Sequence, residues 1–481
     1  MPPSAASSNN AATRFDAPGL TDAAGGELVR AGSLSSSGGA VDSRLVSAGN
    51  IFFALAGDRT DGHRFLEDAV AAGATALVVA QELPGDRVDA LTASGDVTVV
   101  RVDDAAAALR SVAASYRTRF DPLVVGITGS LAKTSTKEQV AEVLEERFEV
   151  LRNPANWNNE IGLPMTLLRL RPEHEVAVLE MGLYTTGEIA LLAQLARPSI
   201  GIVTAVRGVH LSRAGSIETI EAGKRELVEA LPADGWAILN ADDPRVLGMA
   251  GDTRARVLTY GFGDAAEVRA TDIRSLGAAG MRFKLQLPQG AREVTTPVLG
   301  RHGVHNALAA VAVATCADMA IDDIIRGLGR DFAMPHRSQL ISAGAWTILD
   351  DSYNASPDAV LAALGLLAEL PGRRIAVLGE MLELGDAAAA EHRRVGEHAA
   401  GVADELIVVG EGARGIVDGA IGCGMDTSSV RLAADRDEAL SILLAVLRDG
   451  DTVLLKASRG AELDLLVEKL VLAARAGEAK A

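Results

Sequence analysis

The fold of this chain is decided by one stretch, Val124-Val125-Gly126-Ile127-Thr128-Gly129-Ser130-Leu131-Ala132-Lys133-Thr134-Ser135-Thr136-Lys137. Residues 123–127 are apolar and predict a buried strand, residues 129–132 predict a tight turn, and the residues from Thr134 onward predict a helix. Such a unit can cradle a phosphate group, because the N–H groups of the turn and the N-terminus of the helix both favour an anion. The alternative is an ordinary turn between a strand and a helix.

Two side chains strengthen the phosphate interpretation. Lys133 can reach the outer phosphates of a nucleotide, and the Thr134 hydroxyl can bind a magnesium ion. The phosphate-loop pattern has glycine immediately before the lysine, whereas this chain has Ala132. If the turn needs a left-handed residue there, the Cβ costs about 1 kcal/mol and crowds the phosphate.

Length and composition narrow the class of protein. A chain of 481 residues is too long for one core and indicates three domains. The formal net charge of −18 argues against a nucleic-acid partner, which needs a basic surface. The two cysteines, Cys316 and Cys423, are interpreted as small apolar residues in a reducing compartment. With no apolar run of about 18 residues we expect no membrane span, and a cytoplasmic enzyme fits these features.

The central part of the chain places polar residues just after predicted strands. Glu180 follows the apolar run 176–179, and His210 follows the predicted strand 200–206. Ligands of open α/β sheets lie beyond the carboxyl ends of the strands, so Glu180 can hold magnesium, and His210 is a candidate for a metal or phosphate contact. Lys224 lies on a predicted helix, 220–231, where a solvated lysine is the alternative.

Two further loops carry candidate binding residues. Asn158 and Asn159 stand in a loop rich in amides, which predicts either a self-capped turn or a rim that faces a ligand. Ser43 and Arg44 precede a glycine-containing turn in the first part of the chain and could hold a diphosphate. A solvated loop is the alternative for this pair.

The pattern restarts near Gly329. Predicted strands at 346–349, 374–378, 406–409 and 452–455 are each followed by a helix, which indicates a parallel, doubly wound sheet. Arg337, Asp351, Lys456, Ser458 and Arg459 gather at the edge where ligands bind such a sheet. These charges suggest a lid over a nucleotide or an acidic substrate.

The expected fold is therefore α/β with three domains. A flexible tail at 1–18 precedes an α/β N-terminal domain at 19–120. A central phosphate-loop domain with a mostly parallel sheet occupies 121–331, and a Rossmann-like, doubly wound C-terminal domain occupies 332–481.

The chain resembles the Mur ligase family over nearly its whole length. Residues 128–135, that is Thr128, Gly129, Ser130, Leu131, Ala132, Lys133, Thr134 and Ser135, resemble the family's phosphate loop. More specific are Asn158-Asn159-Glu160-Ile161-Gly162-Leu163-Pro164 and Leu349-Asp350-Asp351-Ser352-Tyr353-Asn354-Ala355-Ser356-Pro357, which look like segments of the D-alanyl-D-alanine-adding branch.

The resemblance implies an ATP- and magnesium-dependent amide ligase in cytoplasmic peptidoglycan precursor synthesis. The terminal carboxylate of a UDP-N-acetylmuramoyl-tripeptide would be phosphorylated, and the amine of D-alanyl-D-alanine would then attack the acyl phosphate. Phosphorylation removes the charge that repels a nucleophile, and Lys133 would stabilise the transferred phosphoryl group. The expected partners are these small molecules, and the chain is expected to be a monomer.

The resemblance also implies roles for single residues. Thr134, Glu180 and His210 match magnesium ligands, and Lys224 matches a lysine that carries a carbamate in several relatives. Asn306 would contact adenine, Arg337 the phosphates and Asp351 the ribose, with Tyr353 in the same nucleotide site. Ser43 and Arg44 would face the uridine diphosphate, and Asn158 and Asn159 the muramoyl peptide. Lys456, Ser458 and Arg459 are further substrate-binding candidates.

Ala132 and Gly303 depart from the family pattern near the ATP site. The residues on either side of His210 also differ from that pattern. The alternatives are another ligase of this type, adding diaminopimelate or lysine or resembling a folylpolyglutamate synthase, and a non-catalytic homologue that binds nucleotide. A small-molecule kinase is a third alternative, which the second α/β domain after Gly329 disfavours.

Overall fold

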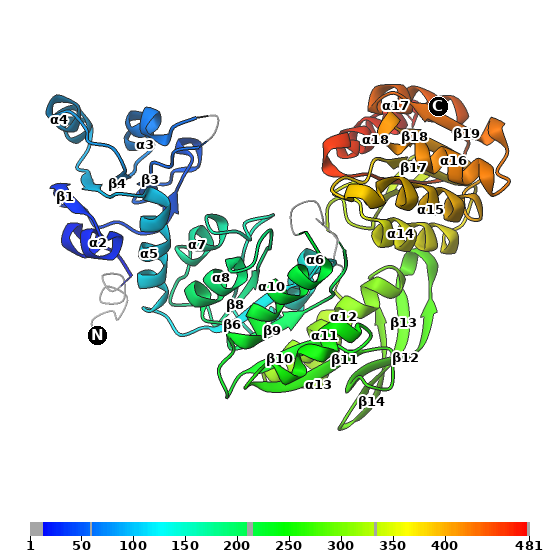
Figure 1. Ribbon diagram of the computed structural model, residues 1–481, viewed down its shortest axis with the longest axis horizontal. Helices are drawn as coiled ribbons and strands as arrows, with labels where there is room; N and C mark the ends of the chain where they lie inside the picture. The colour runs from blue at the N-terminus through cyan, green and yellow to red at the C-terminus, as the bar shows by residue number, and fades with distance from the viewer. Residues whose placement is uncertain (1–12, 58–59, 209–214, 331–333, 479–481) are drawn as a thin grey trace.

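Three separate β-sheets organise the protein in a computed structural model that describes residues 13–57, 60–208, 215–330 and 334–478. The three sheets follow one another along the chain, with the central one between the other two (Figure 1). The predicted three-domain α/β architecture is therefore confirmed. Among the described helices, none combines the length and the apolar character that crossing a lipid bilayer requires.

The first sheet has five strands in the order β1-β5-β4-β3-β2, parallel except for β1 against β5. The expected tail at 1–18 is too long, because the Phe15 side chain is buried and α2 begins at Ala17. The strands are β1 (Glu27–Arg30), β2 (Gly39–Ala40), β3 (Ile51–Phe53), β4 (Ala76–Val79) and β5 (Thr98–Arg101), and the helices are α2 (Ala17–Ala24), α3 (Leu66–Ala71), α4 (Gly85–Ser94) and α5 (Ala105–Arg117).

Helix α5 joins the first domain to the second. Its buried side chains belong to one apolar cluster that also includes residues of the central sheet. Tyr116 donates a hydrogen bond from its hydroxyl to the carbonyl of Leu170, 3.0 Å away, and Arg117 donates from Nε to the carbonyl of Ala196 at 3.1 Å. The two domains therefore share a continuous core.

The central sheet has nine strands in the order β14-β13-β12-β11-β10-β9-β6-β8-β7. It is parallel from β7 to β12, and only β12, β13 and β14 pair antiparallel, so the mostly parallel prediction is confirmed. The strands are β6 (Leu123–Thr128), β7 (Val150–Arg152), β8 (Val176–Glu180), β9 (Ile200–Val203), β10 (Trp236–Asn240), β11 (Arg256–Gly261), β12 (Val268–Ser275), β13 (Met281–Leu287) and β14 (Gly290–Thr296).

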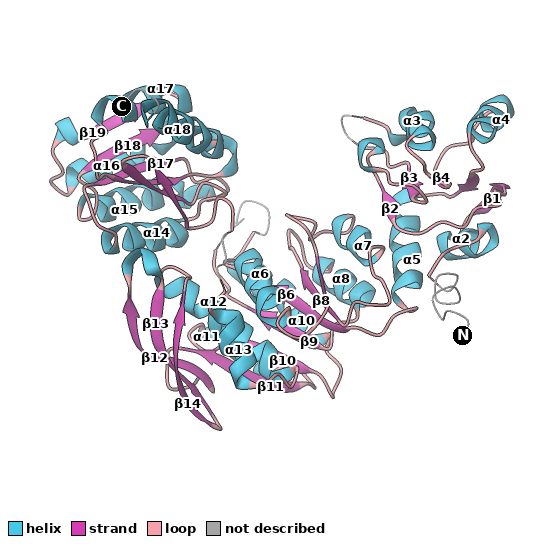
Figure 2. Ribbon diagram, turned by 180° about the vertical axis from the view of Figure 1, so that it is seen from behind, coloured by secondary structure: helices cyan, strands magenta, loops and turns pink. Residues whose placement is uncertain are grey.

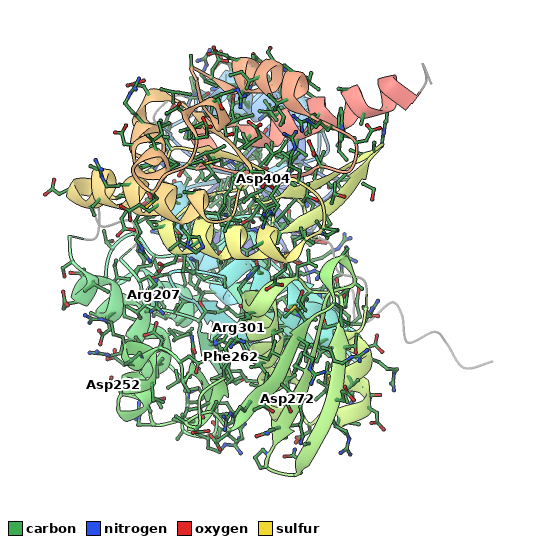
Figure 3. All side chains as sticks on the ribbon, turned by 90° about the vertical axis from the view of Figure 1, so that its right-hand side faces the viewer. Arg207, Asp252, Phe262, Asp272, Arg301 and Asp404 are labelled. Atoms are coloured by element: carbon green, nitrogen blue, oxygen red, sulfur yellow. The ribbon has the colours of Figure 1, made fainter. Side chains whose placement is uncertain are left out.

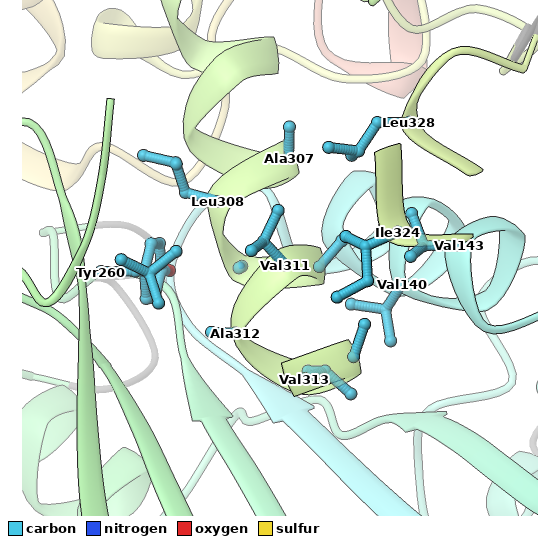
Figure 4. Close-up of a cluster of buried hydrophobic side chains, with 14 of the residues drawn as sticks. Val140, Val143, Tyr260, Ala307, Leu308, Val311, Ala312, Val313, Ile324 and Leu328 are labelled. Atoms are coloured by element: carbon cyan, nitrogen blue, oxygen red, sulfur yellow. The ribbon is translucent and has the colours of Figure 1, made fainter. Parts of the chain in front are cut away.

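The central helices are α6 (Lys133–Leu144), α7 (Gly162–Leu167), α8 (Glu188–Ala196), α10 (Ile217–Glu229), α11 (Pro244–Gly248), α12 (Gly300–Cys316) and α13 (Ile321–Leu328). Helix α12 runs through the core, where its Leu308 and Val311 are fully buried with Val140 of α6 (Figure 4). At the start of α12 the Arg301 guanidinium lies over the Phe262 ring, 4.6 Å from its centroid (Figure 3). These contacts fix α12 against both α6 and the end of β11.

The third sheet has six strands in the order β15-β16-β20-β17-β18-β19. Helices α14, α15 and α16 cover one face, and α17 and α18 cover the other (Figure 2), as a doubly wound sheet requires. One strand departs from the expected parallel pattern: β15 pairs antiparallel with β16, because a short turn at 344–345 joins them directly. The strands are β15 (Gln339–Ala343), β16 (Trp346–Asp350), β17 (Arg374–Gly379), β18 (Glu405–Val409), β19 (Val430–Ala433) and β20 (Thr452–Lys456), and the helices are α14 (Pro357–Glu369), α15 (Ala388–Ala400), α16 (Arg414–Gly422), α17 (Arg436–Val446) and α18 (Leu463–Glu478).

Candidate active site

The phosphate loop links β6 to α6, as the sequence predicts. Gly129 has a φ of 150°, and an added Cβ would collide with the Thr204 hydroxyl. That hydroxyl donates a hydrogen bond to the carbonyl of Leu131 at 2.6 Å, and the N–H of Ser130 donates to the carbonyl of Ala205 at 2.7 Å. The predicted strand 200–206 ends earlier, at Val203, because the following residues turn to hold the loop.

Ala132 adopts the left-handed backbone conformation, with φ 63° and ψ 3°. The position is therefore one that favours glycine, and the alanine holds a conformation that L-residues adopt at a cost. Because Ala132 directly precedes α6, this strain lies at the end of the loop beside Lys133.

A cavity of about 270 Å³ opens beside the loop. Six of the predicted site residues line it: Gly129, Ser130, Lys133, Asn158, Asn159 and Lys224. The complete lining consists of Gly129, Ser130, Lys133, Asn158, Asn159, Glu160, Gly182, Leu183, Tyr184, Glu188, Leu191, Leu192 and Lys224. The lining thus combines two lysines, two glutamates and two asparagines with leucines of α8 and of the segment before it.

The two lysines of the cavity have unusual surroundings. Burial lowers the pKa of Lys133, the Glu180 carboxylate opposes this shift, and the Arg337 guanidinium adds to it. Burial and the charge of Lys133 hold the pKa of Lys224 well below the usual range for lysine, and only 4% of this residue is exposed. A nearby anion would favour the charged form of either amine, because an opposite charge offsets the cost of burial.

Glu180 is the last residue of β8 and is 2% exposed. Its Oε1 accepts a hydrogen bond from Asn158 Nδ2 at 2.7 Å, whereas Oε2 is buried without a hydrogen-bond partner within the described part of the chain. A buried carboxylate oxygen that lacks a donor fits a cation, since leaving it unpaired is costly. Glu180 therefore suits the predicted metal role.

The rest of the predicted metal set is only partly observable. The Thr134 hydroxyl and Lys224 lie within the described residues, but His210 lies outside them. Across the ranges that the structure describes, no three His, Cys, Asp or Glu side chains form a metal-binding group. Within the described residues, Glu180 and the Thr134 hydroxyl are thus the candidates for a magnesium site.

Residues of the third domain reach the phosphate loop. Arg337 donates a hydrogen bond from Nη2 to the Thr134 hydroxyl at 3.2 Å, and its guanidinium lies 4.0 Å from the centroid of the Tyr353 ring. The guanidinium of Arg459 lies 5.3 Å from the same ring. The Tyr353 ring thus lies close to two cationic side chains, Arg337 and Arg459, beside the phosphate loop.

Asp351, which is partly buried, and the buried Lys456 form an ion pair rather than two free charges. Lys456 Nζ lies 2.6 Å from Asp351 Oδ2 and donates to the carbonyl of Asn354 at 3.0 Å. Asp351 Oδ1 accepts from the N–H of Ser338 at 3.0 Å. Lys456, only 3% exposed, therefore holds Asp351 in place.

Asn306 lies in the second turn of α12, not at its start, so helix capping does not explain it. Its Oδ1 accepts a hydrogen bond from the Thr136 hydroxyl of α6 at 3.3 Å. In the amide loop, Asn159 Oδ1 accepts from the N–H of Gly162 at 2.8 Å while the residue also lines the cavity. The self-capped turn is thus confirmed at Asn159, and its position in the cavity lining is compatible with contact to a ligand.

Ser43 and Arg44 lie apart from this constellation, in a short turn of the first domain. Arg44 is exposed and pairs with Asp42, whose Oδ2 lies 2.6 Å from Arg44 Nη2. The structure does not bring this pair to the phosphate loop.

A second cavity, of about 460 Å³, lies at the carboxyl ends of strands in the third sheet. Among the predicted residues Ser458 lines it, and the Ser458 hydroxyl accepts a hydrogen bond from the N–H of Leu382 at 2.9 Å. The complete lining consists of Glu380, Leu382, Val409, Gly410, Ala434, Asp435, Arg436, Asp437, Ser458, Gly460, Ala461 and Glu462. Four carboxylates against one guanidinium make this cavity acidic.

The sequence analysis missed Lys137 and Asn153, which contact each other behind the phosphate loop. A signal was present for Lys137. It lies three residues before Val140 and seven before Leu144, on the apolar stripe of α6, where a lysine is unexpected.

Comparison with known proteins agrees with this geometry. Sequence models of three domains match the chain: the Mur ligase family catalytic domain at residues 38–117, the Mur ligase middle domain at 127–314, and the Mur ligase glutamate ligase domain at 336–459. These matches include strands of all three sheets, although β1 lies before the first of them.

Two curated relatives carry the name UDP-N-acetylmuramoyl-tripeptide–D-alanyl-D-alanine ligase. The protein from Mycobacterium tuberculosis is 38% identical over 467 residues, covering 89% of this chain and 91% of that protein. The protein from Escherichia coli is 36% identical over 454 residues, covering 94% and 97%.

Two solved structures are similar over most of the chain. MurF from Acinetobacter baumannii has a TM-score of 0.84 at 28% identity, covering 95% of this chain and 99% of that one. MurF from Thermotoga maritima, solved in complex with ADP, has a TM-score of 0.79 at 26% identity, covering 92% and 98%.

Proposed function

The chain belongs to the Mur ligase family, and from that membership we propose that it joins D-alanyl-D-alanine to a UDP-N-acetylmuramoyl-tripeptide in peptidoglycan precursor synthesis. Members of this family use ATP. The observation that carries the proposal is the cavity beside the phosphate loop, which Lys133 and Lys224 line, together with the attraction between Lys133 and the buried carboxylate of Glu180. Such a site can hold a triphosphate and a second anion together.

The reaction follows from the chemistry of a carboxylate. A carboxylate oxygen of the tripeptide attacks the terminal phosphorus of ATP, and the bond to ADP breaks, which gives an acyl phosphate. The amine of D-alanyl-D-alanine then attacks the acyl carbon, loses a proton, and inorganic phosphate departs. Lys133, the N–H groups of the loop and Arg337 can stabilise the negative charge that is transferred.

We assign the metal role to the Thr134 hydroxyl and Glu180, with His210 expected to join them. A bound magnesium ion would supply charge neutralisation at the phosphates. The buried, unpaired Oε2 of Glu180 supports this assignment. For Lys224 we propose the carbamate, because a buried amine with a lowered pKa is more often neutral and can attack carbon dioxide.

The other binding assignments remain proposals. The nucleotide would lie against Asn306, Asp351 and Tyr353, with Ser43 and Arg44 at the uridine diphosphate and Asn158 and Asn159 at the muramoyl peptide. ATP and a UDP-linked substrate imply action in the cytoplasm, and we expect a monomer.

Phosphate release tests the function directly. Purified protein is incubated with ATP, magnesium, a UDP-muramoyl tripeptide and one candidate amine at a time. We expect phosphate release that depends on D-alanyl-D-alanine, together with an amide product of the corresponding mass. Release that depends on a single amino acid instead would defeat the proposal. Lys133→Met is the matched inactive variant, since it removes the cation while preserving the length of the side chain.

A further inference from the structure

Lys137 is a buried charge that the reaction itself does not use. It lies on α6 one turn after Lys133, and it is 0% exposed. Its Nζ donates to the backbone carbonyl of Asn153 at 2.6 Å and lies 2.6 Å from Glu138 Oε1. An ammonium group taken out of water loses its hydration, so these two contacts must hold it in one place.

Asn153 connects Lys137 to the backbone of Glu180. The Asn153 Oδ1 accepts a hydrogen bond from the backbone N–H of Glu180 at 2.9 Å, and Nδ2 donates to the backbone carbonyl of Glu180 at 3.1 Å. The same Nδ2 donates to the carbonyl of Trp157 at 2.9 Å. Asn153 is fully buried, so one side chain fixes both polar backbone groups of Glu180.

The backbone around Glu180 is therefore held from several sides, and one recorded hydrogen bond holds its carboxylate. The next residue, Met181, donates its N–H to the carbonyl of Ile127 in β6 at 2.8 Å. Asn158, five residues after Asn153, donates to Oε1 and leaves Oε2 buried without a donor among the described residues. The direction in which Oε2 of Glu180 points therefore depends on the position of Asn153.

We propose that Lys137 is a positioning residue, which fixes Asn153 and through it aims the Glu180 carboxylate at the nucleotide's metal ion. The inference rests on the proposed role of Glu180 in the proposed function. Lys137 does not line the cavity and makes none of the hydrogen bonds that hold the phosphate loop. Its effect on Glu180 is therefore transmitted by Asn153. Groups that orient a metal-binding side chain commonly change metal affinity about 10- to 100-fold when removed.

The test measures ADP affinity by calorimetry on the full chain, with magnesium and with a chelator. For the unaltered protein we expect magnesium to tighten ADP binding. In Lys137→Met we expect the gain from magnesium to fall about tenfold, with the affinity for metal-free ADP unchanged. Lys137→Arg keeps a donor for the Asn153 carbonyl and should retain most of the gain. Gln139→Met, at another buried polar residue of α6, is the matched control and should retain all of it.

Asn153→Ala gives an independent reading if Lys137→Met does not fold, because it removes the same link from the other end. The double variant should lose no more of the magnesium gain than either single variant, since both act on one chain of contacts. An unchanged magnesium gain in Lys137→Met, an equal loss of metal-free affinity, or additive losses in the double variant would each overturn the inference. Absence of any magnesium gain in the unaltered protein would instead overturn the metal role of Glu180, and this inference with it.

Discussion

Arg337 of the third domain donates a hydrogen bond from Nη2 to the hydroxyl of Thr134, 3.2 Å away at the start of α6. The two residues are 203 positions apart in the chain. This contact sets a cation of the third domain directly on the phosphate loop of the second. It also joins two residues for which the sequence predicts nucleotide contacts.

Replacing Arg337 by methionine should lower kcat/KM for ATP about 10- to 100-fold, because a hydrogen bond to a charged group contributes about 1.5–3 kcal/mol. The kcat/KM of Arg337→Lys should lie between those of the unaltered protein and Arg337→Met. Lysine keeps the charge but does not stack on Tyr353 as a planar group. Steady-state phosphate release measures both. Arg330→Met, which removes an arginine paired with Glu146 elsewhere, is the control. Equal losses at Arg330 would contradict a specific role for Arg337.

Ala132→Gly should stabilise the protein by about 0.5–1 kcal/mol. A left-handed alanine costs about 1–2 kcal/mol, of which the greater freedom of glycine in the unfolded chain offsets a part. Denaturant unfolding checks the sign. Ala387→Gly is the control, because Ala387 is exposed with φ −79° and the same change there should destabilise. We also expect ADP to bind more tightly to Ala132→Gly, since a Cβ leaves the phosphate cradle.

Gly129→Ala should abolish ADP binding while the far-UV circular dichroism spectrum stays the same. The added Cβ would meet the Thr204 hydroxyl, and that hydroxyl holds the carbonyl of Leu131 in the loop. Gly85→Ala is the control, because its Cβ would enter open space in α4. Retained ADP affinity in Gly129→Ala would show that the loop accommodates the extra atom.

Lys456→Met should destabilise the third domain by about 1.5–3 kcal/mol, because the partly buried Asp351 carboxylate loses a charge-assisted hydrogen bond. Lys469→Met removes a lysine from an exposed pair with Asp437 and should cost about 0–1 kcal/mol. Denaturant unfolding of both variants makes the comparison. Equal stabilities would mean that Lys456 does not support Asp351.

A carbamate on Lys224 should form more completely as pH rises. Carbamate formation consumes the neutral amine and releases a proton, and the lowered pKa of Lys224 brings the neutral amine closer to physiological pH. With labelled bicarbonate, ¹³C nuclear magnetic resonance should give a carbamate signal that grows between pH 6 and pH 9. The increase should follow the loss of about one proton from the Lys224 ammonium group. Lys224→Arg should lack the signal. A signal that persists in that variant would assign it to another amine.

Much of the fold could be predicted from the sequence because its signals are local. The apolar run at 123–127, the following turn and the periodic helix appear as β6, the phosphate loop and α6. The repeated alternation of strand and helix after Gly329 gave the doubly wound third domain in the same way. Where pairing with distant residues decides the outcome, prediction was less exact: β9 ends at Val203 because the residues after it hold the loop.

The sequence by itself determined that a strand, a glycine turn and a helix beginning at a lysine would form one unit, since bonded neighbours and periodicity specify it. Only the tertiary structure decided that Ala132 is left-handed, that Arg337 reaches Thr134, and that a buried Lys137 fixes Asn153 against Glu180. These relations join segments that are far apart in the chain. They arise when cores pack and buried polar groups must find partners, which no local pattern of residues specifies.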